Sequence, residues 1–267
     1  MSDTAPQTGM PSLRTIALPV EHGGWGFTLE PVLLGLLVAP SLAAWALALT
    51  AVAVFLARRP TKLVLADVLR NRWRSRTTVA AAFTALYGVI AVAGITGALA
   101  SGDRRLLVAY GVAVPLALVA VAADVNRKSR TLLAEVCGAT AMGATVTAMA
   151  SAAGWEYQEA VGLWLVLLGR DLTAIVLVRE QIRRAHGRPG EVSRVYLVCA
   201  LAMIAMAALA AAGFVPWLSV LALAGIASLA RVSLTRPPIP ARAVGWTQMV
   251  TGLVVVVLTA VGVRLGW

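Results

Sequence analysis

The chain has 267 residues, of which 60% are hydrophobic and 13% are charged. A mean hydropathy of +0.83 leaves too little polar surface to cover a water-soluble globule, which excludes an ordinary soluble enzyme and indicates that lipid surrounds the chain. The net charge of +11 is dispersed over short segments between apolar stretches. Membrane topology explains such a distribution, so no nucleic-acid partner is expected.

The first eighteen residues contain no long apolar core, and we expect residues 1–18 to form a disordered cytosolic tail. Residues 19–267 are predicted to form a single transmembrane domain. Nine apolar stretches predict an all-α bundle of about nine spans, because about 20 helical residues cross about 30 Å of hydrocarbon. The predicted spans are 25–39, 41–57, 78–99, 105–123, 132–153, 159–178, 192–213, 215–230 and 243–264.

The first two predicted spans are short, and residues 25–57 could instead form one strongly tilted helix. Pro40 followed by Ser41 favours a break between two helices, because proline disrupts the hydrogen bonds of a helix interior. We therefore predict two separate spans.

Basic residues orient the predicted bundle. Nineteen of the 23 Lys and Arg residues precede the first span or lie in alternate gaps, three lie on the other side, and Arg170 lies inside a span. Since Lys and Arg mark cytosolic loops, the N-terminus is predicted to be inside and the C-terminus outside. Anionic lipid head groups and a phosphate-bearing ligand are the partners that this charge favours.

Four charged residues are predicted to lie within the apolar spans, where an unpaired charge costs several kcal/mol. They are Glu30, Glu135, Arg170 and Asp171, all in the cytosolic halves of their spans. This predicts a polar cavity that is open to the cytosol and closed toward the outside. Glu30 or Glu135 could neutralise Arg170, and a buried ion pair that only fixes helix register explains the pattern equally well.

Two consecutive glycines, Gly23 and Gly24, precede the first predicted span and follow His22. Exposed backbone N–H groups at the start of a helix form an anion site, and histidine can bind an anion, carry a proton or ligate a metal. The other interpretation is a turn into the bilayer with His22 at the interface.

Further along, Asp67 stands alone among arginines in the first large basic segment, where a surface ion pair is the ordinary explanation.

The segment from Leu18 to Gly26 resembles the start of the YwiC-like family of bacterial integral membrane proteins. Later runs carry the same resemblance, namely those at residues 59–63, 133–136 and 178–181. The resemblance covers nearly the whole chain and implies a multi-pass protein of the bacterial cytoplasmic membrane. It brings no known function with it and therefore no catalytic residues.

A more distant resemblance is to the UbiA-like intramembrane prenyltransferases, which share nine spans, an inside N-terminus and large polar loops after the second and sixth spans. Those enzymes hold an isoprenyl diphosphate through magnesium between two aspartate-rich motifs, whereas here Asp67 stands alone and Asp171 is not followed by a second aspartate. The resemblance implies that Asp67 and Asp171 hold magnesium, that Glu135 or His22 takes a proton, and that a set of cationic groups binds the diphosphate. Those groups are Arg127, Lys128 and Arg179.

Three functions follow as hypotheses. The first is a cytosol-facing site for an amphiphilic anion, with prenyl transfer as its catalytic form, in which Glu30, Arg170, Gly23 and Gly24 also contact the ligand. The second is a transporter or permease without catalysis, and the third is an assembly partner of a larger membrane complex whose buried charges serve packing.

Overall fold

The computed structural model describes residues 13–18, 22–188 and 190–266, with only the backbone described for His22 and Gly23. The described chain is all-helical. It contains α1 (Leu13–Ala17), α2 (His22–Val38), α3 (Leu42–Val68), α4 (Ser75–Ser101), α5 (Leu106–Val125), α6 (Leu132–Ala152), α7 (Tyr157–Ala185), α8 (Val192–Ala211), α9 (Trp217–Thr235) and α10 (Ala241–Arg264).

The helices confirm the predicted all-α class and eight of the nine predicted spans. Helices α3 to α10 are long and apolar enough to cross a membrane, and α2 contributes a shorter apolar helix over Gly24–Val38. The predicted break after the first span is also confirmed, because α2 ends at Val38 and Ser41 caps α3 by accepting a hydrogen bond from the Ala44 N–H at 3.1 Å.

Two helices extend furthest beyond their predicted spans. We predicted a span ending at residue 57, but α3 continues to Val68 through Pro60, and α7 continues past 178 to Ala185. Apolar length defines a membrane span but not a helix end, so both helices project beyond their apolar parts. Polar contacts with neighbouring helices stabilise these extensions, as the contacts of Arg58 and Arg179 below show.

The short helix α1 lies within the segment 1–18 that we expected to be disordered. Its residue Ile16 is buried, and Arg59 of α3 donates a hydrogen bond to the Thr15 carbonyl. The described part of this segment, residues 13–18, is therefore attached to the bundle, with α1 packed on α3 and α4.

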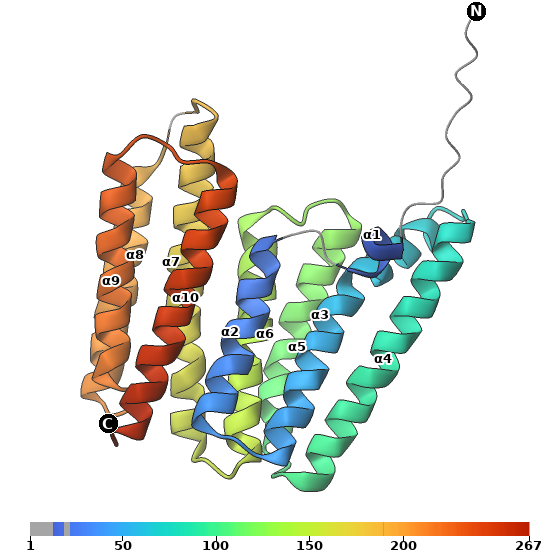
Figure 1. Ribbon diagram of the computed structural model, residues 1–267, viewed down its shortest axis with the longest axis horizontal. Coiled ribbons are helices and arrows are strands. Elements are labelled where there is room, and N and C mark those ends of the chain that lie inside the picture. Colours follow the sequence, from blue (N-terminus) through green and yellow to red (C-terminus); the bar gives the residue numbers. More distant parts are fainter. Residues whose placement is uncertain (1–12, 19–21, 189, 267) are drawn as a thin grey trace, which may run out of the picture.

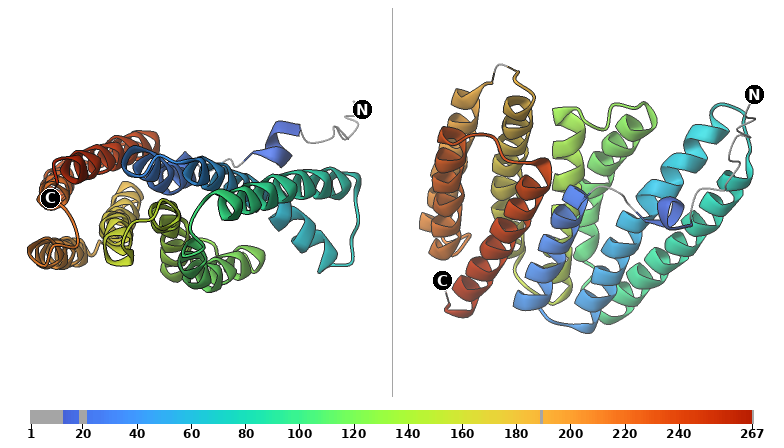
Figure 2. Two further views of the ribbon diagram at one scale, coloured as in Figure 1. Left: turned by 90° about the horizontal axis from the view of Figure 1, so that it is seen from below. Right: turned by 45° about the horizontal axis from the view of Figure 1, so that its top comes forward.

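The nine helices α2 to α10 run alternately up and down and pack in the order of the chain (Figure 1). Each packs on the next, with α10 returning to α2, except that α4 and α5 are not a packed pair. Helix α6 also packs on α2 and α3, which flattens the arrangement into two rows (Figure 2).

Small residues allow the helices to approach closely. At Gly94 of α4, an added Cβ would lie only 2.7 Å from the Ala46 carbonyl oxygen of α3 and would collide with Thr50 Oγ1. Lipid supplies no hydrophobic drive between helices, so close van der Waals contact of this kind is what holds a membrane bundle together. The α3–α4 pair is thereby tightly joined near the end opposite the N-terminal segment.

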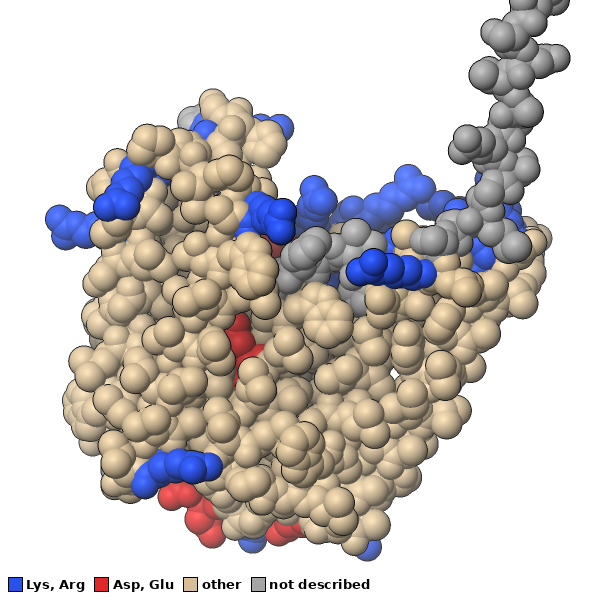
Figure 3. Space-filling model, in the orientation of Figure 1, with Lys and Arg blue, Asp and Glu red and all other residues tan. Residues whose placement is uncertain are grey.

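The loops after α3, α5, α7 and α9 gather at one end of the bundle, which we call the basic end. Figure 3 shows most of the visible Lys and Arg at this end and mixed charges at the opposite end. The separation of charge along the bundle therefore agrees with the alternation in the sequence, while the direction of insertion remains a prediction.

Candidate functional site

A cavity of about 1560 Å³ lies between the two rows in the basic half of the bundle. Its walls come from α2 to α8 and α10. Among the described residues its polar lining has a strong positive excess, with nine cationic side chains against four carboxylates. The cationic ones are Arg58, Lys62, Arg130, Arg170, Arg179, Arg183, Arg188, Arg194 and Arg242, and the carboxylates are Asp124, Glu135, Glu180 and Glu191.

The remaining walls of the cavity are largely apolar. They include Phe55 of α3, Ala91 of α4, Ala117 of α5 and Met142 of α6. Because a helix rises about 1.5 Å per residue, Ala117 lies roughly 10 Å along α5 from Asp124 toward the bundle centre. The cavity is therefore amphiphilic, with charge near the basic end and an apolar surface further in.

A buried charge cluster joins α2 to α7. Arg170 Nη2 lies 2.7 Å from Glu30 Oε1, and Arg170 Nη1 lies 3.6 Å from Asp171 Oδ1. Arg170 also donates a hydrogen bond of 2.7 Å to the Gln248 carbonyl of α10, and its guanidinium stands 5.7 Å from the Phe27 ring centre. Three helices thus meet at the one arginine that the sequence places inside a span, and of the two acids proposed for it Glu30 is its partner.

Not every polar atom of this cluster is satisfied. Within the described residues, Arg170 Nε, Glu30 Oε2 and Asp171 Oδ1 are buried without a hydrogen-bond partner. Glu30 Oε1 also lacks a well-aligned hydrogen bond despite its short distance to the guanidinium. Two carboxylates therefore face one buried guanidinium, and Arg170 lies at the cavity wall.

Glu135 and Arg179 form a second ion pair, at the cavity wall nearer the basic end. Arg179 Nη1 donates to Glu135 Oε2 at 2.8 Å and to the Arg130 carbonyl at 2.9 Å. Both side chains are partly exposed, at 31% for Glu135 and 40% for Arg179. The structure therefore brings together two of the residues that we proposed from the sequence, one acid and one anion-binding candidate.

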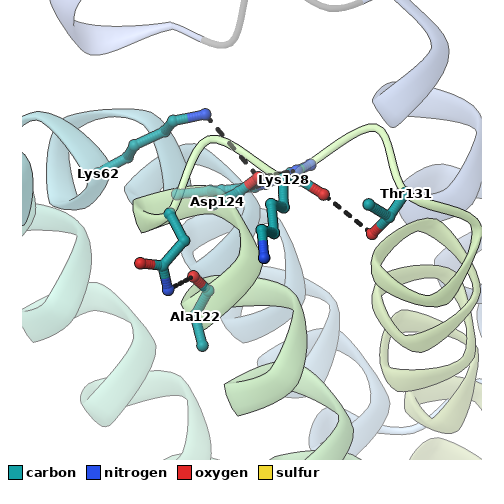
Figure 4. A network of polar contacts seen from close by, with 7 residues as sticks. Lys62, Ala122, Asp124, Lys128 and Thr131 are labelled. Atoms are coloured by element: carbon teal, nitrogen blue, oxygen red, sulfur yellow. Dashed lines mark hydrogen bonds and ion pairs between the residues drawn. The ribbon is translucent and has the colours of Figure 1, made fainter.

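Asp124 at the end of α5 is a site residue that our sequence analysis missed. Its carboxylate accepts two hydrogen bonds from Arg58, at 2.6 and 3.0 Å, and lies 3.8 Å from Lys62 Nζ. Figure 4 shows Lys62 reaching from α3 to Asp124 on α5. The sequence did contain a signal for this contact. Asp124 is an acid at the end of an apolar stretch, and Arg58 and Lys62 lie one helical turn apart in a basic segment predicted at the same end of the bundle.

Glu180 is a second missed acid. It is buried and lines the cavity, and its Oε2 accepts a hydrogen bond of 2.9 Å from the Glu191 N–H at the start of α8. An added Cβ at Gly190 would collide with Glu180 Oε1. Glu180 therefore holds the α7–α8 loop against the cavity.

Asp67 lies away from this cavity. Its two oxygens accept hydrogen bonds from Arg76 at 3.0 and 3.3 Å, and Oδ2 also accepts one from Thr77 at 2.7 Å. The carboxylate thus joins the end of α3 to the start of α4. Neither Asp67 nor Asp171 is among the residues that line the cavity.

The arrangement of acids does not suit the magnesium site that the UbiA resemblance implies. Within the described residues, no three Asp, Glu, His or Cys side chains are grouped so that they could hold a metal ion. Asp67 is saturated by Arg76 and Thr77, and Asp171 has a guanidinium beside it. No step through a metal follows from this geometry.

The remaining candidates lie at the basic end. Arg127 and Lys128 form the exposed turn after α5, where Arg127 has a φ of 59° and the Lys128 carbonyl accepts from Thr131 Oγ1 (Figure 4). Neither lines the cavity. Gly23 and Gly24 lie in the first turn of α2, and Gly24 lines the cavity. The side chain of His22 lies outside the described residues.

The comparisons with known proteins give one match. The family of YwiC-like proteins matches residues 18–150, which includes α2 to α5 and nearly all of α6. No curated protein and no solved structure matches the chain. The resemblance to the YwiC-like family is therefore confirmed, and the distant resemblance to the UbiA-like enzymes stays a prediction.

Proposed function

Since this chain is a membrane protein of the YwiC-like family, with apolar helices in contact with lipid, we propose that it binds an amphiphilic anion in the cavity of its basic half. The ligand would carry a phosphate or diphosphate head and an apolar, isoprenoid-like chain. The proposed location is the bacterial cytoplasmic membrane, with the basic end in the cytosol.

The observation that carries this proposal is the composition of one continuous cavity. Nine cationic side chains against four carboxylates favour an anion, and arginine forks match phosphate oxygens with paired hydrogen bonds. The apolar walls of α3 to α6 favour a hydrocarbon chain. A purely polar metabolite would leave these walls uncovered, and a neutral lipid would leave the cationic excess without a partner.

Arg179 is the best placed of the cationic residues to contact the head group. It lines the cavity, it is 40% exposed, and its existing partners occupy only Nη1. The other guanidinium N–H groups can therefore donate to a phosphate while Glu135 holds the side chain in place. Glu135 in turn is the cavity acid that our prenyl-transfer hypothesis uses to take a proton.

Prenyl transfer is the catalytic form of this proposal and has its own test. It predicts turnover of an isoprenyl diphosphate that is lost in Glu135→Ala, because Glu135 is the acid at the cavity wall that takes the proton. Binding without turnover, or turnover that survives this substitution, would remove the catalytic role of Glu135 and leave the binding function in place.

The binding function is tested by native mass spectrometry of the gently extracted protein and by titration with geranylgeranyl diphosphate. We expect one retained or added anionic amphiphile per chain, and weaker binding in Arg179→Ala than in Arg72→Ala, a loop arginine outside the cavity lining. Failure of the wild-type protein to bind any phosphate-bearing amphiphile would overturn the proposal. A stable co-purifying subunit with no bound lipid would favour the assembly function instead.

A further inference from the structure

The bundle is open between α4 and α5. These helices follow each other in the chain and are described over their whole length, yet α4 packs on α3 and α5 packs on α6 without forming a packed pair of their own. Helix α4 leans away from the upright α5 toward the basic end (Figures 1 and 2). What lies beside this opening in a membrane is the hydrocarbon of the lipids.

The cavity reaches this opening from inside. Gly88 and Ala91 of α4 line it on one side, and Ala117, Ala120 and Val121 of α5 line it on the other. All five side chains are small or apolar, and the nearest cavity charge on these two helices is Asp124, one turn from Val121. These five positions therefore suit a hydrocarbon chain, whereas the cationic side chains nearest to them, Arg58 and Lys62 of α3, lie beside Asp124 toward the basic end.

Gly88 of α4 stands beside free space. At Gly94 an added Cβ would collide with Thr50, because this residue faces α3 where the two helices are tightly packed. Gly88 lies six residues nearer the basic end and faces a different direction, since each residue turns a helix by about 100°. An added Cβ at Gly88 would meet no atom within 4 Å, and Gly88 lines the cavity.

We propose that the opening between α4 and α5 is a lateral entrance, through which the apolar chain of the anionic amphiphile passes from the membrane into the cavity. Gly88 sets the width of this entrance. The inference rests on the proposed function, because an entrance for a chain requires a ligand that has one. The head would remain near the basic end, where the cavity carries its cationic side chains.

The test is a comparison of Gly88→Phe with Gly111→Phe. Gly111 lies on α5, its added Cβ also meets no atom within 4 Å, and it does not line the cavity, so it controls for a large aromatic group in an equally open position. Geranylgeranyl diphosphate and dimethylallyl diphosphate serve as probes with the same head and a long or a short chain. The association rate constant of each probe is measured by stopped-flow mixing with each purified protein.

We expect Gly88→Phe to slow association of the long-chain probe by about tenfold or more, equivalent to about 1.4 kcal/mol of activation free energy, and to leave the short-chain probe and the Gly111→Phe protein unchanged. Ala117→Phe, from the opposite wall, should reproduce the effect if Gly88→Phe does not fold. Equal association rates of the long chain with wild type and both wall variants would overturn the entrance while leaving the binding function intact.

Two other outcomes would also overturn the entrance. Wild-type protein that binds neither probe would contradict the proposed function and the entrance that depends on it. A native mass spectrum that shows a dimer, which Gly88→Phe dissociates and Gly111→Phe does not, would assign the opening to a second copy of the chain.

Discussion

Gly252 of α10 leaves the space that the side chains of the buried charge cluster occupy. An added Cβ there would collide with Glu30 Oε1 and approach Arg170 Nη2 to 2.6 Å. We therefore expect Gly252→Ala to lower the free energy of unfolding by about 1 to 3 kcal/mol, because overpacking displaces a buried ion pair. Thermal unfolding in detergent measures the effect. Gly245→Ala, on the same helix and without a neighbour within 4 Å, should be stable, and an equal loss in both would contradict this account.

Removing Arg170 alone should destabilise the protein more than removing both members of the ion pair. Replacing Arg170 by Met leaves two buried carboxylates without a cation and is expected to cost about 3 to 5 kcal/mol of unfolding free energy. The double variant Arg170→Met with Glu30→Gln removes one of these charges and should recover part of the loss. A double-mutant cycle with Glu30→Gln alone measures the coupling, and strictly additive losses would show that the two residues do not interact.

The charged residues differ in how far the sequence revealed them. Glu30, Arg170 and Asp171 stand out because charge is rare inside apolar stretches, and that rarity was enough to predict a buried ion pair. Asp124 was missed because it lies at the end of its stretch, where an acid looks like an ordinary loop residue. Its partner Arg58 is 66 residues away in the chain. Pairing over such a distance depends on how helices pack, which no local pattern contains.

At the scale of the elements, the Arg58–Asp124 pair joins α3 to α5 at the basic end. Asp124 is buried, so Asp124→Ala leaves Arg58 and Lys62 facing each other and is expected to lower the thermal midpoint of unfolding. The charge exchange Arg58→Asp with Asp124→Arg should recover part of the stability, because the attraction is retained in reverse. Arg59→Asp is the control, since Arg59 contacts only a backbone carbonyl in the described chain. Absence of any recovery would contradict the pairing.

Apolar length and proline placement predicted the helices well, but not how they are arranged. The break at Pro40 follows from local chemistry, whereas the extension of α3 to Val68 depends on contacts with α5. The lack of extensive packing between α4 and α5 is likewise invisible in the sequence, because both segments have the composition of ordinary apolar spans. In lipid, a segment's own sequence decides whether it forms a helix. Which helices pack together depends on how small and large side chains fit across the bundle.

At the scale of the whole molecule, the basic end should face the cytosol. Nineteen of 23 Lys and Arg residues belong to the N-terminal segment and to the loops and helix ends of the basic end, and moving such charges across a membrane is unfavourable. Nine crossings then place the C-terminus on the opposite side. Alkaline phosphatase fused after Arg264 should therefore be active, because it folds only outside the cytosol, and the same fusion after Arg236 should be inactive.

Green fluorescent protein fused at the same two positions should give the opposite result, with fluorescence only after Arg236. The pair of reporters fixes the orientation of the last helix, whereas the side of the N-terminal segment distinguishes nine crossings from eight. If the short helix α2 lay along the membrane surface without crossing, the eight long helices alone would return the C-terminus to the N-terminal side. Because the later loops keep their positive charge, the Arg236 fusion would still report the cytosol and the N-terminal segment would lie outside. A tag ahead of Leu13 that is protected from external protease in intact cells therefore supports nine crossings, and its digestion would show that α2 does not span.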